Sequence, residues 1–247
     1  MSSGDSTSSP HLVVSGLTKT YGHLVALDRV SFTIRGGEVL GLIGPNGAGK
    51  TTLFECLAGV LPMDQGTIRV GGQPLSARHR SERLFYVPDA IGPWPTQSVR
   101  WALDFMIGFF GGPPERRAEV IERFDLAPFL DGRIGTLSKG QRKRAVLALG
   151  LLTPQPLLLA DEPFDGLDLR QTQQIGAALR AHAAAGRTLF LSIHSIYDAA
   201  RVCDRFILLS GGRVCGEGTL DELTDAAAER SGQPRASSLE DVFLALT

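Results

Sequence analysis

The chain has 247 residues, of which 43% are hydrophobic and 21% are charged, and its net charge is -1. This composition is typical of a folded globular protein and excludes disorder, collagen and coiled coil as the main architecture. The near balance of charges gives no electrostatic indication of a nucleic-acid partner, so none is expected.

Three further features bound the cellular setting. The cysteines Cys56, Cys203 and Cys215 are odd in number and widely spread, which excludes a disulfide framework and favours a reducing compartment. No stretch of the sequence offers the roughly 20 mostly apolar residues that a transmembrane helix needs. Residues 1–10 contain neither a basic residue nor an apolar run, so we expect a flexible polar tail rather than a signal peptide.

Short apolar runs alternate with helical patterns along the chain, which predicts an α/β fold. Val39–Ile43, Leu157–Ala160 and Leu189–Ile193 are almost wholly apolar, as expected for central strands covered on both faces. The earlier runs alternate in polarity between glycine-rich turns, which indicates an antiparallel edge layer. The predicted strands are Leu12–Val14, Val30–Ile34, Val39–Ile43, Thr67–Val70, Leu84–Val87, Leu157–Ala160, Thr188–Ile193, Phe206–Leu209 and Arg213–Gly216.

Helical patterns predict one main domain over residues 11–230, with a helical subdomain inserted at about 90–155. A linker at Ser231–Ala236 leads to an amphipathic C-terminal helix within 238–247, whose apolar face we expect to dock on its own domain. The predicted helices before it are Lys50–Leu61, Glu115–Phe124, Gly140–Leu152 and Arg170–Ala185.

The strongest motif is a phosphate-binding loop that follows the strand Val39–Ile43 and opens a helix. Its glycines let successive N–H groups face an anion, its lysine reaches the terminal phosphates of a nucleotide, and its threonine hydroxyl ligates Mg²⁺. The alternative is a glycine-rich turn that happens to precede a helix. The predicted nucleotide-binding residues of this loop are Gly44, Pro45, Asn46, Gly47, Ala48, Gly49, Lys50, Thr51 and Thr52.

Two acidic residues follow the apolar strand Leu157–Ala160. A carboxylate at the end of a buried strand beside a nucleotide site suits a Mg²⁺ contact, which we assign to Asp161 with Thr51. Glu162 is then free to act as general base toward an attacking water. Acidic residues that merely end a strand are the alternative interpretation.

Together these motifs resemble the ATP-binding cassette (ABC) ATPases over nearly the whole chain. Three further segments match that family: a signature, a D-loop and a switch histidine, His194. Tyr21 is similar to the aromatic residue that stacks on adenine. The signature comprises Leu137, Ser138, Lys139, Gly140 and Gln141, with Lys139 where glycine is commonest, and the D-loop comprises Asp165, Gly166, Leu167 and Asp168.

The resemblance implies a P-loop NTPase core with an antiparallel β edge layer and an inserted α-helical subdomain. It implies ATP and Mg²⁺ as cofactors, and a second cassette whose signature completes each nucleotide site in trans. His194 would then contact the γ-phosphate. Considered singly, Ser138 could be a plain helix cap, His194 a structural histidine and Tyr21 a core residue.

The C-terminal segment resembles that of cassettes which serve exporter-type permeases. We therefore expect an ATPase subunit that dimerises around two MgATP and drives a separate membrane permease, in the cytoplasm on the inner face of the membrane. The alternatives are a soluble ABC ATPase acting on a macromolecular complex and a non-hydrolysing cassette, although Glu162 argues against the latter. The sequence does not name the transported substrate.

Two features depart from the family pattern or extend it. Asp89 follows Pro88 where most cassettes place a glutamine, and we expect it to keep a Mg²⁺ contact, with a simple turn residue as the alternative.

The inserted region is also dense in large apolar residues, which we expect to divide between its core and a permease-docking surface. These are Trp94, Trp101, Phe105, Met106, Phe109 and Phe110.

Overall fold

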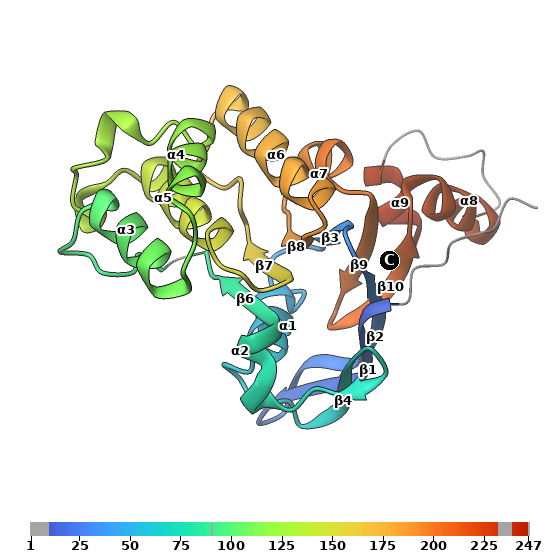
Figure 1. Cartoon of the computed structure of the whole chain (residues 1–247). Coiled ribbons are helices and arrows are strands. Elements are labelled where there is room, and N and C mark those ends of the chain that lie inside the picture. Colours follow the sequence, from blue (N-terminus) through green and yellow to red (C-terminus); the bar gives the residue numbers. More distant parts are fainter. Residues whose placement is uncertain (1–9, 90, 232–238, 247) are drawn as a thin grey trace, which may run out of the picture.

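A computed structural model describes residues 10–89, 91–231 and 239–246, and shows two sheets with helices packed around them (Figure 1). The larger sheet has six strands in the order β10-β9-β3-β8-β7-β6. The four strands β3, β6, β7 and β8 and their neighbour β9 run parallel, and β10 is antiparallel to β9. The strands are β3 (Val39–Ile43), β6 (Leu84–Val87), β7 (Leu157–Asp161), β8 (Thr188–Ser192), β9 (Arg205–Ser210) and β10 (Arg213–Gly218).

The central strands are buried along their whole length, as their apolar sequences predicted: every residue of β3, β7 and β8 is buried. In a parallel sheet the carboxyl ends of neighbouring strands meet at one edge. This arrangement brings the residues that follow β3, β6, β7 and β8 together, although they are far apart in the sequence.

The smaller sheet is antiparallel, as predicted, with strand order β2-β1-β4-β5. Three of its strands are longer than predicted, and the fourth, the two-residue β5, was not predicted. The pairing of β1 continues through register irregularities around Gly16. The strands are β1 (Pro10–Tyr21), β2 (Leu24–Arg35), β4 (Gln65–Val70) and β5 (Gln73–Pro74). Pro10 thus belongs to β1, and the remaining residues of the expected N-terminal tail lie outside the described part of the chain.

Helices cover the larger sheet, and three of them form a group between β6 and β7 on one side of the molecule (Figure 1). This group, α3, α4 and α5, gives the fold its inserted helical portion; the boundaries of about 90–155 stay a prediction. The α-helices are α1 (Lys50–Ala58), α2 (Arg80–Arg83), α3 (Val99–Phe110), α4 (Pro114–Arg123), α5 (Lys139–Leu151), α6 (Leu169–Ala184), α7 (Ile196–Val202), α8 (Leu220–Ser231) and α9 (Leu239–Leu246). Short 3-10 turns lie at Ala77–His79, Ala127–Phe129 and Ile134–Thr136.

The helix ends show how local sequence sets the boundaries. The helix predicted over Lys50–Leu61 stops at Ala58, because Gly59 adopts a left-handed conformation (φ 77°) that caps it. Helices α2, α7 and α8 were missed by the sequence analysis, and α3 lies in the predicted helical insert without having been predicted as a separate helix. Thr219 and Glu222 bond each other's backbone N–H groups at the start of α8, a capping pattern visible in the sequence.

The C-terminal helix α9 docks as its apolar spacing predicted. Leu239, Val242 and Leu246 are buried, whereas Leu244 points outward and is 73% exposed. Apart from Ser231, which ends α8, and Leu239, which begins α9, the predicted linker and the segment that follows it lie outside the described residues. None of the helices described here is both long and apolar enough to cross a bilayer.

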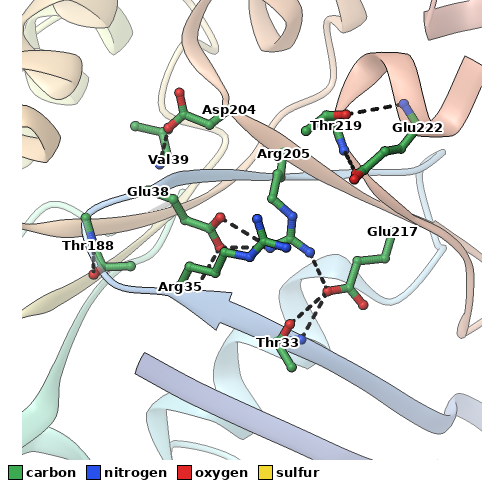
Figure 2. Close-up of polar contacts among 11 residues, drawn as sticks. Thr33, Arg35, Glu38, Val39, Thr188, Asp204, Arg205, Glu217, Thr219 and Glu222 are labelled. Atoms are coloured by element: carbon green, nitrogen blue, oxygen red, sulfur yellow. Dashed lines mark hydrogen bonds and ion pairs between the residues drawn. The ribbon is translucent and has the colours of Figure 1, made fainter. Parts of the chain in front are cut away.

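A buried ion-pair network joins the two sheets (Figure 2). Arg205 of β9 donates to both oxygens of Glu38 at 3.1 and 3.2 Å and to Glu217 of β10 at 2.8 Å. The Glu217 carboxylate also accepts from the backbone and hydroxyl of Thr33 in β2, each at 3.2 Å. The arginine therefore satisfies two carboxylates that would be costly to bury unpaired.

Candidate nucleotide and catalytic site

The phosphate loop spans residues 44–49, between the end of β3 and the start of α1. Gly49 has φ 103°, and a Cβ there would lie 2.7 Å from the carbonyl oxygen of Ala26, so only glycine fits. A Cβ on Gly44 would lie 2.3 Å from the carbonyl oxygen of Leu209. Helix α1 has no side-chain cap at its N-terminus, so the N–H groups of its first turn are available to an anion.

Lys50 bends back over this loop. Its Nζ donates to the carbonyl oxygens of Gly44 at 2.8 Å and Pro45 at 3.3 Å, and lies 3.6 Å from Oε1 of Glu162. The side chain is buried. One ammonium group thus contacts both the phosphate loop and the glutamate that follows β7.

Asp161 is the buried centre of the site. Its Oδ2 accepts from the Thr51 hydroxyl at 2.8 Å and, more weakly, from the Tyr86 hydroxyl at 3.5 Å, while Oδ1 accepts from the hydroxyl of Ser192. Burial and the neighbouring carboxylate raise the pKa of Tyr86, so its phenol stays a donor. Sequence analysis predicted Asp161 and Thr51 but missed Tyr86 and Ser192.

Ser192 lies opposite Asp161 in the β7–β8 register, at the carboxyl end of β8. Its hydroxyl and its carbonyl oxygen both accept from the backbone N–H of Glu162, at 3.0 and 3.2 Å. Position at the end of a central strand was the one signal in the sequence that could have identified it. Ser192 therefore links the two acidic residues that the sequence singled out.

Glu162 turns sharply out of the strand. Its φ of 48° is unusual for a residue with a side chain, and the two bonds from its N–H hold that conformation. Burial raises the pKa of the Glu162 carboxyl, Lys50 lowers it, and Asp161 raises it. A carboxylate with a raised pKa is suited to accept a proton.

Two cavities meet at Glu162. One, of about 540 Å³, runs from Tyr21 past the phosphate loop to Asp161 and Asp89. The other, of about 460 Å³, lies between the D-loop and the exposed His194 that follows β8. Asn46, Asp89 and Glu162 line both. Tyr21 is 47% exposed at the wall of the first cavity, so the alternative of a core residue is excluded.

The signature forms the start of α5. The Ser138 hydroxyl accepts from the N–H of Gln141 at 3.3 Å, and the Gln141 side chain accepts from the N–H of Ser138 at 3.0 Å. Ser138 is thus a helix cap, as the alternative interpretation proposed, and its role toward a nucleotide stays a prediction. Residues 137–141 all fall in the described part of the chain and line neither of the two cavities.

Signature and D-loop contact each other within this chain. Lys139 Nζ lies 2.5 Å from Oδ2 of Asp165, and a Cβ on Gly140 would lie 2.8 Å from the carbonyl oxygen of Gly166. The D-loop then ends at Asp168, whose carboxylate caps α6 by accepting from the N–H of Gln171 at 2.8 Å. The D-loop therefore packs directly against the start of α5.

Asp89 has a partner that sequence analysis did not foresee. Its Oδ1 lies 2.5 Å from Nζ of Lys143 on α5. The expected metal contact at Asp89 stays a prediction. One of the two carboxylate oxygens of Asp89 is already paired with the Lys143 ammonium. Asp89 also lines both cavities, and the choice between a metal contact and a turn residue stays a prediction.

Comparisons with known proteins agree on one family. The family model of the ABC transporter matches residues 27–165. Nod factor export ATP-binding protein I of Mesorhizobium japonicum is 36% identical over 228 residues, which cover 90% of this chain and 67% of that protein. The protein of the same name from a Rhizobium species is 37% identical over 212 residues, covering 83% and 70%.

Solved structures show the same fold. An ATP-binding subunit of an ABC transporter superposes with a TM-score of 0.83 at 28% identity, over 95% of this chain and 98% of that one. A bacterial Atm1-family ABC exporter with ATP bound superposes with a TM-score of 0.77 at 23% identity, over 88% and 40%. The chain therefore belongs to the ABC transporter family, as an ATP-binding cassette ATPase.

Proposed function

We propose that this chain is the ATP-hydrolysing subunit of an ABC exporter, working as a dimer of cassettes on a separate membrane permease. One observation carries the catalytic part: Lys50 Nζ lies against two carbonyl oxygens of the phosphate loop and 3.6 Å from Glu162. The phosphate site and the proposed base are therefore adjacent. Such adjacency is what hydrolysis of a terminal phosphate requires.

The phosphate loop and the first three residues of α1, together residues 44–52, bind the phosphates, and Tyr21 at the other end of the cavity stacks on the base of the nucleotide. Thr51 and Asp161 fit Mg²⁺, because a hydroxyl and a buried carboxylate 2.8 Å apart are the hard oxygen ligands this ion takes with phosphates. When bound, the ion would neutralise phosphate charge. Whether Asp89 also contacts it is part of the same proposal.

Glu162 accepts a proton from the attacking water, while the oxygen of that water forms a bond to the γ-phosphorus and the bond to the leaving ADP oxygen breaks. His194, on the wall of the neighbouring cavity, donates a hydrogen bond to the γ-phosphate. Lys50 compensates negative charge on the phosphates.

The signature supports a dimer. Ser138 and its helix start line neither cavity of their own cassette, although a helix N-terminus is suited to bind an anion. We propose that residues 137–141 of one cassette complete the site of a second cassette, either an identical or a related chain.

The proposal of an exporter rests on the names of the relatives, and the proposal of a permease contact rests on an exposed aromatic surface of α3. Both relatives described above carry the name of an export ATP-binding protein. Trp101, Phe105 and Phe109 form a stacked row on the outer face of α3, and each is at least 40% exposed. We propose that this row contacts the permease, which would hold the subunit at the cytoplasmic face of the membrane. Met106 on the same helix is buried, so the dense apolar set divides between core and surface.

The substitution E162Q tests the proposed base. Glutamine keeps the shape but cannot take a proton, so ATP hydrolysis should fall by about 10²–10⁴-fold. ATP binding should survive, and an ATP-bound dimer should accumulate in light scattering. K50A should instead weaken ATP binding itself. Near-normal hydrolysis by E162Q would place the base elsewhere, and unchanged ATP affinity in K50A would refute the loop assignment.

A further inference from the structure

Three carboxylates surround the proposed phosphate site, and each has its own partner. Asp161 accepts from hydroxyl groups, and Glu162 lies 3.6 Å from the ammonium of Lys50. Asp89 is paired with Lys143 on α5, at 2.5 Å. Polyanionic phosphates are repelled by bare carboxylates, so the partner of Asp89 bears on nucleotide binding.

The Lys143 side chain is buried beside Asp89 and is held there by several acceptors. Its side chain is 4% exposed, and besides Asp89 Oδ1 its Nζ donates to the carbonyl oxygens of Asp89 at 3.4 Å and Asp161 at 3.5 Å. Three acceptors match the three hydrogens of an ammonium group. Because a buried cation without partners is very costly, these acceptors favour the position of the ammonium beside Asp89.

Asp89, in contrast, faces outward. Its side chain is 37% exposed and it lines both the cavity of the phosphate loop and the cavity of His194. It therefore presents negative charge toward the place where the terminal phosphates would lie. Lys143 is the cation in direct contact with this carboxylate in the described part of the chain, and Lys139 adds a longer-range attraction.

We infer that Lys143 is a positioning residue for ATP binding: it neutralises Asp89 and holds its carboxylate against the wall shared by the two cavities. The inference rests on the proposed nucleotide site. Without Lys143, the Asp89 carboxylate repels the phosphates, and ATP suffers more than ADP because it carries the additional γ-phosphate. The cation acts through Asp89 and does not itself touch the nucleotide.

The test measures affinity for ATP and ADP in EDTA by calorimetry on the full chain, so that no metal contributes. K143M should weaken ATP binding about 10–100-fold, because the charge of Asp89 is then uncompensated at the phosphate site. ADP binding should weaken less. The double variant D89N/K143M removes the repelling charge as well, and should regain ATP affinity to within about threefold of the wild type.

The neighbouring Arg144 supplies a matched control. It is also a buried cation of α5, but it pairs with Asp125 at 3.1 Å and donates to the carbonyl oxygen of Phe124, in the helical group. R144M should lower the melting temperature and leave ATP affinity unchanged. Loss of ATP affinity in R144M equal to that in K143M would reduce the effect to general destabilisation and overturn the inference.

A double variant that binds ATP no better than K143M would also overturn it, because the repelling charge is then absent and affinity should have returned. An equal loss of ATP and ADP affinity in K143M would overturn it as well, because a merely structural ion pair does not distinguish the two nucleotides. Should K143M fail to fold, D89N alone decides: its ATP affinity in EDTA should equal or exceed that of the wild type. Weaker binding by D89N would show that the carboxylate itself attracts the nucleotide. The variant K50A tests the nucleotide site separately from this inference. If K50A binds ATP normally, the assignment of the site is wrong; if K50A loses ATP binding, the site stands and the results for K143M and D89N decide the role of Lys143.

Discussion

Replacement of Ser192 by alanine should damage the proposed catalytic site while leaving the phosphate loop intact. The Ser192 hydroxyl is fully buried, donates to Asp161 and accepts from the backbone N–H of Glu162 at 3.0 Å. Its loss leaves Oδ1 of a buried carboxylate unpaired, which costs about 1.5–3 kcal/mol for a hydrogen bond to a charged group. At roughly 2–4 °C per kcal/mol for a chain of this size, the melting temperature should fall by roughly 3–12 °C.

Activity should respond separately from binding. Glu162 keeps one bond to the Ser192 carbonyl oxygen at 3.2 Å, but loses the second contact that holds its unusual backbone conformation. A misplaced base lowers kcat, here by about tenfold or more, because small displacements of catalytic groups are costly. ATP affinity, which depends on the loop and Lys50, should change by less than about threefold.

Thr153 is the control for this experiment. It is a buried residue outside the site, and its hydroxyl donates to the carbonyl oxygen of Gly150 at 2.7 Å and accepts from Arg187 at 2.6 Å. T153A should lower the melting temperature similarly without changing kcat. The measurements are thermal unfolding, steady-state ATPase rates and ATP titration. An S192A enzyme with wild-type kcat and melting temperature would refute the reasoning.

Two further predictions concern pH and the exposed aromatic row. Burial raises the pKa of Glu162 more than Lys50 lowers it, and a protonated carboxyl cannot act as a base. The kcat at saturating ATP should therefore fall as the pH drops through a value above the pKa of an ordinary glutamate. A pH–rate profile whose acidic limb lies at or below that ordinary pKa contradicts the prediction. The rings of Trp101, Phe105 and Phe109 are exposed and line neither cavity. Replacing all three by serine should therefore leave the ATPase rate of the isolated subunit unchanged and abolish the stimulation of that rate by a permease. Full stimulation of this variant would exclude this surface as the contact with the permease.

The sequence predicted the fold well where local pattern decides it. Almost wholly apolar runs predicted β3, β7 and β8, and all three strands are buried from end to end. Boundaries were less accurate, because a single residue such as Gly59 ends a helix through its backbone conformation rather than its polarity. Helix α7 was missed because seven residues give too short a pattern for helical periodicity to show.

The candidate site was predictable in its motifs and less so in its supporting residues. The phosphate loop, Asp161 and Glu162 are identified by contiguous residue types, and the structure brings them together through Lys50 and Thr51. Ser192 belongs to no such motif. Its importance comes from the register between β7 and β8, which sets it opposite Asp161, and register between distant strands is a property of the folded sheet.

The pairing of Lys143 with Asp89 was unpredictable for an electrostatic reason. The two residues are 54 positions apart, and each alone is compatible with an exposed surface position. The chain has 26 acidic residues that could neutralise a lysine on α5, and charge is not directional in the way that hydrophobic periodicity is. Only the packing of α5 against the ends of β6 and β7 buries the ammonium and so selects Asp89 as its partner. Because the start of the same helix contacts the D-loop through Lys139 and Asp165, one helix carries both the signature and the cation that pairs with Asp89.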